Sequence, residues 1–227
     1  MLYRATNWLT LSIFLLIFSV TASIAESRTG EKKTTDPAPA KKEAKIEGFR
    51  SAKFGMKSSS IFKAISKDFN ISKKNIKLNV HPVEQTTRLE ITVPKLLEIG
   101  GTAKINYILG FKSKRLTQVN IVWGRNAENE PKKKINAQDV VNVANFLRNH
   151  LIKRKYKKEG LVANTRMNDA QTMVFRGRDK KNRMALLLLN SPKGADAIKS
   201  QQSVSLALSY ISNPDKMDIF TIKEDDF

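Results

Sequence analysis

Two runs of basic side chains have the residue types and spacing that could bind an anion. The denser run lies at 153–158, where five of six consecutive side chains are cationic: Lys153, Arg154, Lys155, Lys157 and Lys158. Lysine and arginine bind phosphates and carboxylates through charge-assisted hydrogen bonds. The same run also fits ordinary helix chemistry, because cations in the last turn of a helix interact favourably with the negative end of the helix dipole.

The second run is short and lies between two stretches of alternating apolar residues, at 111–115. Its cations are Lys112, Lys114 and Arg115. The flanking alternation predicts that this segment is a hairpin loop. A tight loop with three cations and the Ser113 hydroxyl could hold a phosphate, but a charged hairpin tip also serves to discourage pairing with other sheets.

No motif in the chain predicts catalysis, a metal site or a cofactor. The chain has no Cys, which excludes disulfides, thiolate ligands and cysteine nucleophiles. Its two histidines, His81 and His150, are 69 residues apart, and no further ligands accompany them at metal-site spacing. Gly100 and Gly101 precede no helix, so they predict a turn and not a phosphate loop. We therefore expect no catalytic residue, no metal ion and no cofactor.

The positive charge is concentrated in one part of the chain. The 227 residues hold 41 Lys and Arg against 21 Asp and Glu, a formal net charge of +20. Residues 49–160 account for +16 of this charge, with 24 basic and eight acidic side chains. Such a field attracts anions over long distances. Two interpretations of this charge remain: a surface that binds an anionic partner, and a surface that is only solvated.

Residues 1–25 have the layout of a secretory signal peptide. Arg4 precedes the apolar run Leu9–Val20, and the small residues Ser23 and Ala25 follow it. This layout predicts cleavage near Ala25 and a periplasmic or secreted protein. The alternative is an uncleaved anchor, although twelve apolar residues fall short of the roughly 20 in a spanning helix. Export disfavours nucleic acid as a partner and limits membrane contact to peripheral binding unless the segment is retained.

The next segment, 26–48, predicts a disordered linker. It holds six basic and five acidic side chains, two prolines and, apart from Ile46, no large apolar residue. Such a composition buries too little apolar surface to offset the entropy of ordering. Two similar halves follow the linker, at 49–125 and at 126–227.

Each half predicts a helix followed by antiparallel strands. In the first half, Ser58–Ser60 can cap a helix whose apolar stripe ends at Phe69. In the second, Asn136 and Asp139 resemble a capping box ahead of an apolar stripe that ends at Leu151. Alternating apolar residues predict strands near 76–80, 89–93, 105–109, 119–123, 173–176, 184–189 and 204–210, with an edge segment at 215–222.

This order predicts an α+β fold, with two open sheets or one continuous sheet as the alternatives. The repeated order is similar to that of tandem-repeat binding proteins of the β-lactamase-inhibitor type. The residues that we expect in the core are Phe54, Ile61, Ile65, Phe69, Leu89, Ile91, Tyr107, Leu109, Val119, Ile121, Trp123, Leu147, Leu151, Leu206, Leu208 and Tyr210.

Three stretches resemble a family of secreted or periplasmic proteins of Gram-negative, chiefly alphaproteobacterial, bacteria. They are FRSAKFGM at 49–56, NYILGFKSKRLTQVNIVWG at 106–124, and LALSYI at 206–211 followed by DIF at 218–220. The resemblance extends from Phe49 to the C-terminus. It implies export, but it implies no activity and assigns no catalytic residue.

We therefore expect a non-enzymatic periplasmic binding protein with a basic face. Its partner would be an anionic envelope component or an acidic protein, and the residues that we expect to bind it are the eight cations of the two runs. One alternative is an inhibitor or assembly partner of another periplasmic protein. Another is an envelope hydrolase or transferase whose site carries no familiar motif.

Overall fold

A computed structural model describes residues 41–128, 134–192 and 203–221. The expected leader, most of the expected linker and the last residues of the acidic C-terminus lie outside these described residues. The two α-helices are α1, Ser58–Phe69, and α2, Ala137–Leu151. The α+β class expected from the sequence is confirmed, because both helices accompany antiparallel strands.

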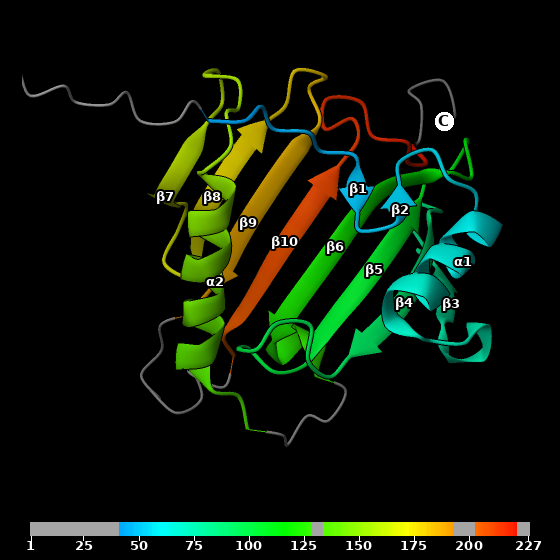
Figure 1. Cartoon of the computed structure of the whole chain (residues 1–227), viewed down its shortest axis with the longest axis horizontal. Coiled ribbons are helices and arrows are strands. Elements are labelled where there is room, and N and C mark those ends of the chain that lie inside the picture. Colours follow the sequence, from blue (N-terminus) through cyan, green and yellow to red (C-terminus); the bar gives the residue numbers. More distant parts are fainter. Residues whose placement is uncertain (1–40, 129–133, 193–202, 222–227) are drawn as a thin grey trace, which may run out of the picture. The chain divides into compact units, whose positions relative to one another are not determined.

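One continuous eight-stranded sheet forms the centre of the fold (Figure 1). Its order is β3-β4-β5-β6-β10-β9-β8-β7, and each neighbouring pair is antiparallel. The strands are β3 Lys77–Val80, β4 Thr87–Val93, β5 Ala103–Leu109, β6 Leu116–Gly124, β7 Val162–Arg166, β8 Gln171–Arg178, β9 Met184–Asn190 and β10 Ser205–Ile211. The last strand of each half, β6 and β10, therefore meet at the centre of the sheet.

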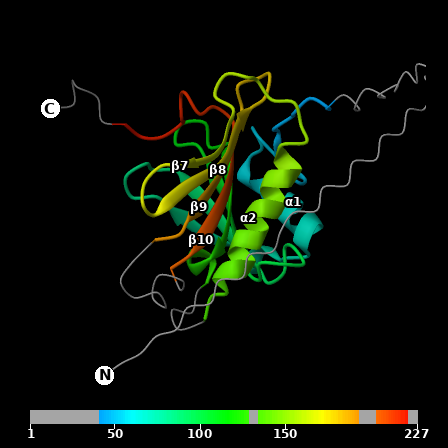
Figure 2. The same cartoon turned by 90° about the vertical axis from the view of Figure 1, so that its left-hand side faces the viewer.

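Both helices lie on the same side of this sheet (Figure 2). Alternation along each strand sends one set of side chains to that side and the other set to the open side. On β6, for example, Val119, Ile121 and Trp123 are buried, while Gln118 and Asn120 between and beside them are only half-buried. The sheet thus has one apolar face under the helices and one more polar, open face.

The core lies between the helices and the sheet, as the sequence predicts. Twelve of the sixteen expected core residues are buried, and the other four are partly buried and pack against them. Those four are Phe54, Phe69, Leu147 and Tyr210. Trp123 and Tyr107 are the largest fully buried side chains.

The helix boundaries confirm one expected cap and correct another. Asn136 caps α2, because its side-chain oxygen accepts hydrogen bonds from the N–H groups of Gln138 and Asp139. The N-cap of α1 is Lys57, which makes no side-chain capping bond, so the expected serine cap is wrong. The serines lie inside the first turn, where their oxygens are past the capping position.

The chain between 41 and 53 packs against the folded unit, which differs from the linker expected as far as residue 48. Ala44 and Ile46 are 6% and 4% exposed, and they alternate with charged neighbours that face solvent. The Ile46 N–H donates to Asp179 Oδ2 over 3.0 Å. A short hairpin follows, made of β1, Gly48–Phe49, and β2, Ala52–Lys53.

The C-terminal segment and β7 are two further differences from the sequence expectations. The described part of the expected edge segment, 215–221, forms no strand. Instead it is held by hydrogen bonds outside any strand ladder, such as Phe220 N–H to Glu84 O, 2.9 Å. Strand β7 has no alternating apolar residues and was not expected. Among the described residues, no helix is long and apolar enough to cross a membrane.

Replacing Trp123 by Ala should lower the free energy of unfolding by about 3–5 kcal/mol, because a large cavity would open beneath α2. Trp123 is 1% exposed and lies in the central strand β6. Urea unfolding monitored by circular dichroism measures the loss. Phe146→Ala, at a position 54% exposed on α2, is the control and should cost no more than about 0.5 kcal/mol. Equal losses in the two variants would contradict this account of the core.

Candidate functional site

The hairpin run lies at the tip between β5 and β6, as the sequence predicts, and its cations are exposed. Two of them already have partners within the chain. Lys114 Nζ lies 5.0 Å from the centre of the Phe111 ring, and Arg115 Nη1 donates to Gly55 O over 3.0 Å. These contacts fix the side chains along the loop, so they do not converge on a shared point above it.

The backbone of this hairpin binds a carboxylate of the same chain, that of Asp218. The N–H groups of Lys112 and Ser113 donate to the Asp218 carboxylate over 2.8 and 3.0 Å. Phe111 N–H donates to the Asp218 backbone oxygen over 2.8 Å. Gly110 leaves room for this contact, since a Cβ at that position would collide with the carboxylate. Asp218 therefore occupies the place where an external phosphate was expected.

The electrostatics of Asp218 follow from these contacts. Partial burial acts to raise the pKa of Asp218, but the hydrogen bonds from Ser113 and from the Lys112 N–H outweigh it. The net result is a pKa below the ordinary value for an aspartate, so the carboxylate stays charged at neutral pH.

Residues from three separate stretches of the chain meet around this hairpin. Phe111 and Phe220 meet edge to face with ring centres 5.4 Å apart. On the other side of the hairpin, Leu116 N–H donates to Met56 O over 2.8 Å. The stretches at 49–56, 106–124 and 218–220 therefore share one structural junction.

The denser run at 153–158 lies beyond the end of α2, and this corrects the expectation that it forms the last helical turn. The helix ends at Leu151. Lys155 instead pairs with the N-terminal segment, since its N–H donates to Lys42 O and its carbonyl accepts from Ala44 N–H, both over 2.9 Å. Attraction to the helix dipole, which fades within the last turn, therefore does not explain this run.

Cations from a third segment join this run. Glu43 Oε1 lies 3.5 Å from both Lys155 Nζ and Lys180 Nζ, and Lys180 belongs to the hairpin between β8 and β9. Lys157 Nζ donates to Asn182 Oδ1 in the same hairpin over 2.5 Å. A single carboxylate thus lies between lysines that are 25 residues apart in the sequence.

Next to this cluster, on the helix side of the sheet, lies a pocket of about 530 Å³. We call it the basic pocket. Its cationic and imidazole side chains are Lys42, Lys45, His150 and Arg154, and Glu43 is its only carboxylate among the described residues that line it. Of the eight expected site residues, only Arg154 lines the basic pocket. The structure does not bring the hairpin run and the 153–158 run into one site.

Two tyrosines, Tyr156 and Tyr210, line the inner part of the basic pocket. Burial raises the pKa of Tyr156 to about 12, and burial also raises the pKa of Tyr210. Both phenols therefore keep their protons at neutral pH. They can donate hydrogen bonds, but they are unsuited to act as a base or an anionic nucleophile.

Sequence reasoning missed Lys42, Lys45 and Lys180. The first two lie in a segment whose composition indicated a linker, and the signal that could have placed them is the alternation of buried Ala44 and Ile46 with charged residues. Lys180 lies in a turn that was expected, but its distance from Glu43 depends on long-range packing.

Comparison with protein-family models, curated proteins and solved structures finds no match. Within the described ranges, no group of three or more His, Asp or Glu side chains could hold a metal ion.

Asp218→Ala should speed amide exchange at Lys112 and Ser113 about tenfold, because hydrogen bonds to a charged acceptor contribute about 1.5 kcal/mol. The Lys114 N–H, which donates to Gly110 O, serves as the control within the same loop. Hydrogen exchange followed by NMR measures both. Unchanged exchange at Lys112 and Ser113 would show that Asp218 does not hold the hairpin.

The same variant tests the pH dependence. Because the pKa of Asp218 is lowered in the folded state, its stabilising effect is complete above the ordinary aspartate range and is lost as the pH falls through the lowered pKa. The difference in unfolding free energy between the wild-type protein and Asp218→Ala should therefore be constant above about pH 5 and shrink below about pH 4.

Proposed function

We propose that this chain is an exported, non-enzymatic binding protein that uses the basic pocket to hold an anionic group of an envelope component or an acidic protein. The observation that carries the proposal is the convergence of Lys42, Lys45 and Arg154, from two distant segments, on one pocket. The apolar leader expected at 1–25 supports export.

The charge around the pocket favours a ligand with several negative charges. Single exposed ion pairs contribute little, about 0–1 kcal/mol each. Three cations acting on one multivalent anion add their contributions, and arginine adds a planar pair of donors that matches phosphate or carboxylate. The negative charge of Glu43 opposes the positive field of the pocket, but this carboxylate is already paired with Lys155 Nζ and Lys180 Nζ, each 3.5 Å away.

The chemistry of the lining favours binding over catalysis. The described residues that line the basic pocket include no Ser, Thr or Cys nucleophile, and both tyrosines are held in their protonated form. The phenols supply neutral hydrogen-bond donors beside the cations, and the His150 ring adds a further polar group. Such a set recognises the oxygens of a phosphate or carboxylate without transferring a group.

We also propose that the two halves form a tandem repeat, as their order suggested. Each half consists of one α-helix followed by four strands that are neighbours in the sheet. The two sets meet through β6 and β10, so the strand order of one half mirrors that of the other.

Binding to lipid vesicles tests the basic pocket. The full-length protein should bind vesicles that contain phosphatidylglycerol at about 50 mM salt and bind them much more weakly at about 300 mM salt, since salt screens exposed charges. Pure phosphatidylcholine vesicles report any binding by the apolar residues 9–20. The triple variant Lys42→Ala, Lys45→Ala, Arg154→Ala should bind at least about tenfold more weakly to the anionic vesicles.

The matched control removes three exposed cations elsewhere, at Lys63, Lys67 and Lys74. It lowers the net charge equally and should reduce affinity less than about threefold. Equal losses in both triple variants would mean that net charge alone, and not the pocket, attracts the anion. If vesicles, an acidic polysaccharide and acidic envelope proteins all fail to bind at low salt, the proposed function is wrong.

A further inference from the structure

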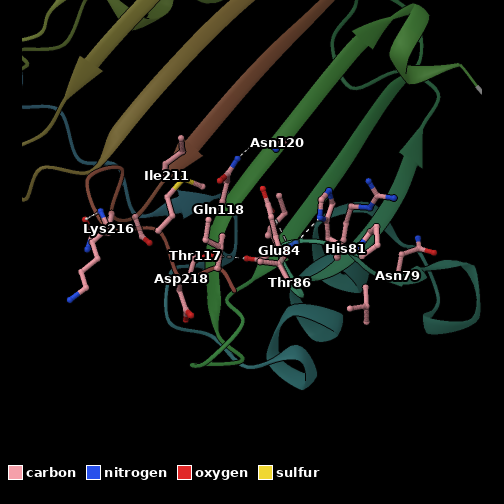
Figure 3. A pocket seen from close by; sticks show the side chains of 18 residues that line it. Asn79, His81, Glu84, Thr86, Thr117, Gln118, Asn120, Ile211, Lys216 and Asp218 are labelled. Carbon is pink, nitrogen blue, oxygen red and sulfur yellow. Dashed lines mark hydrogen bonds between the residues drawn. The ribbon is translucent and has the colours of Figure 1, made fainter. Parts of the chain in front are cut away.

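The open face of the sheet carries a second pocket, of about 460 Å³, that the basic pocket does not explain (Figure 3). Its floor is a row of side chains from five adjacent strands. Strand pairing places them in line, and the row runs Asn79, Arg88, Ile108, Gln118 and Ile211. We call this pocket the sheet groove.

Two loops wall the sheet groove, and they are fastened to the fold and to each other. One wall is the turn between β3 and β4, where His81 N–H donates to Thr86 O over 2.9 Å. The other wall is 212–219, which Asp218 attaches to the β5–β6 hairpin. Phe220 N–H bonds to Glu84 O and joins the two walls. The groove is therefore formed before any ligand arrives.

The polar groups on the floor can pair with an amide. Gln118 Nε2 donates to Asn120 Oδ1 over 2.7 Å, and Figure 3 shows the two side chains next to each other. This bond leaves the Gln118 oxygen as an acceptor and the Asn120 nitrogen as a donor, neither with another partner among the described residues. One acceptor beside one donor is the complement of a peptide group.

The other residues that line the groove favour a peptide over other classes of ligand. No Phe, Tyr or Trp is among the described residues that line the groove, so the His81 imidazole is the one aromatic ring that this described lining offers to a sugar or a base. Ile108, Ile211, Met217 and Ile219 offer apolar contacts for side chains. Arg88, 3.8 Å from Glu90, still has free donors for a carboxylate, and the other charged residues of the lining are Lys216, Glu84 and Asp218.

We propose that the sheet groove binds an extended peptide segment of a partner protein, with a carboxylate directed to Arg88. The floor spans four strand spacings, or about 19 Å, which matches about six residues of extended chain. The adjacent row across the same strands is also polar, with Glu90, Asn106, Asn120 and Ser209 in register. Asn106 Oδ1 is buried there without a hydrogen-bond partner among the described residues.

The probe is an acetylated hexapeptide of alternating Ala and Leu, prepared with a free C-terminal carboxyl group and with a C-terminal amide. Titration of the full-length, ¹⁵N-labelled protein should shift the side-chain amide signals of Gln118 and Asn120. The free carboxyl form should bind at least about fivefold more tightly than the amide form, because only it gains charge-assisted hydrogen bonds.

The variant Arg88→Gln should remove this preference, so that both peptides bind equally weakly. Lys104→Gln is the matched control, because Lys104 is on the same open face but outside the groove, and it should keep the preference. Unfolding midpoints confirm that each variant is folded. Both variants should bind anionic vesicles like the wild-type protein, which separates this inference from the proposed function.

The inference is overturned if neither peptide shifts the Gln118 and Asn120 signals at about 5 mM, a concentration that would occupy about 80% of a site with a dissociation constant of about 1 mM. It is also overturned if an N-acetylglucosamine disaccharide shifts them while the peptides do not, or if Lys104→Gln abolishes the preference for the free carboxyl form as fully as Arg88→Gln does.

Discussion

The pairing of β6 with β10 is the interaction on which the rest of the structure depends. It joins Trp123 to Leu206, Ile121 to Leu208 and Val119 to Tyr210, pairs that are 83 to 91 residues apart in the chain. These side chains form the middle of the apolar face on which α2 packs. Because the two strands are the inner ends of two four-stranded sets, their register also fixes the positions of every outer strand. Both pockets lie against strands of this sheet, so their geometry depends on the same register.

Much of the fold could be predicted from the sequence because alternation and helical periodicity are local signals. The residues of β10 alternate between apolar and small polar types, and the strand lies where that pattern predicted it. The cap at Asn136 was equally local. The sequence signals failed where long-range contacts determine the structure. Strand β7 has no apolar alternation. Ile46 packs in the core, and its N–H donates to Asp179, which is 133 residues away.

The candidate site was harder to predict for the same reason. Arg154 was found because it lies in a dense run, but Lys42 and Lys45 belong to a segment whose composition resembles a linker. The hairpin at 111–115 was one candidate anion site, with a charged hairpin tip as the alternative, and its N–H groups bind the Asp218 carboxylate. The sequence could not show that the anion is Asp218, because no local rule pairs residues that are 106 positions apart. The shape of a pocket depends on such contacts between distant residues, so it could not be predicted from local sequence patterns.

The Asp218 contact also determines what the hairpin can respond to. A carboxylate on the same chain acts as a tethered ligand, with an effective concentration in about the millimolar range or above. If a free phosphate has the same intrinsic affinity for the hairpin as the carboxylate, its concentration must exceed this effective concentration before it can displace the carboxylate. The hairpin should therefore be insensitive to the ordinary concentrations of small anions around it. Competition of this kind leaves the hairpin little capacity to select among external anions.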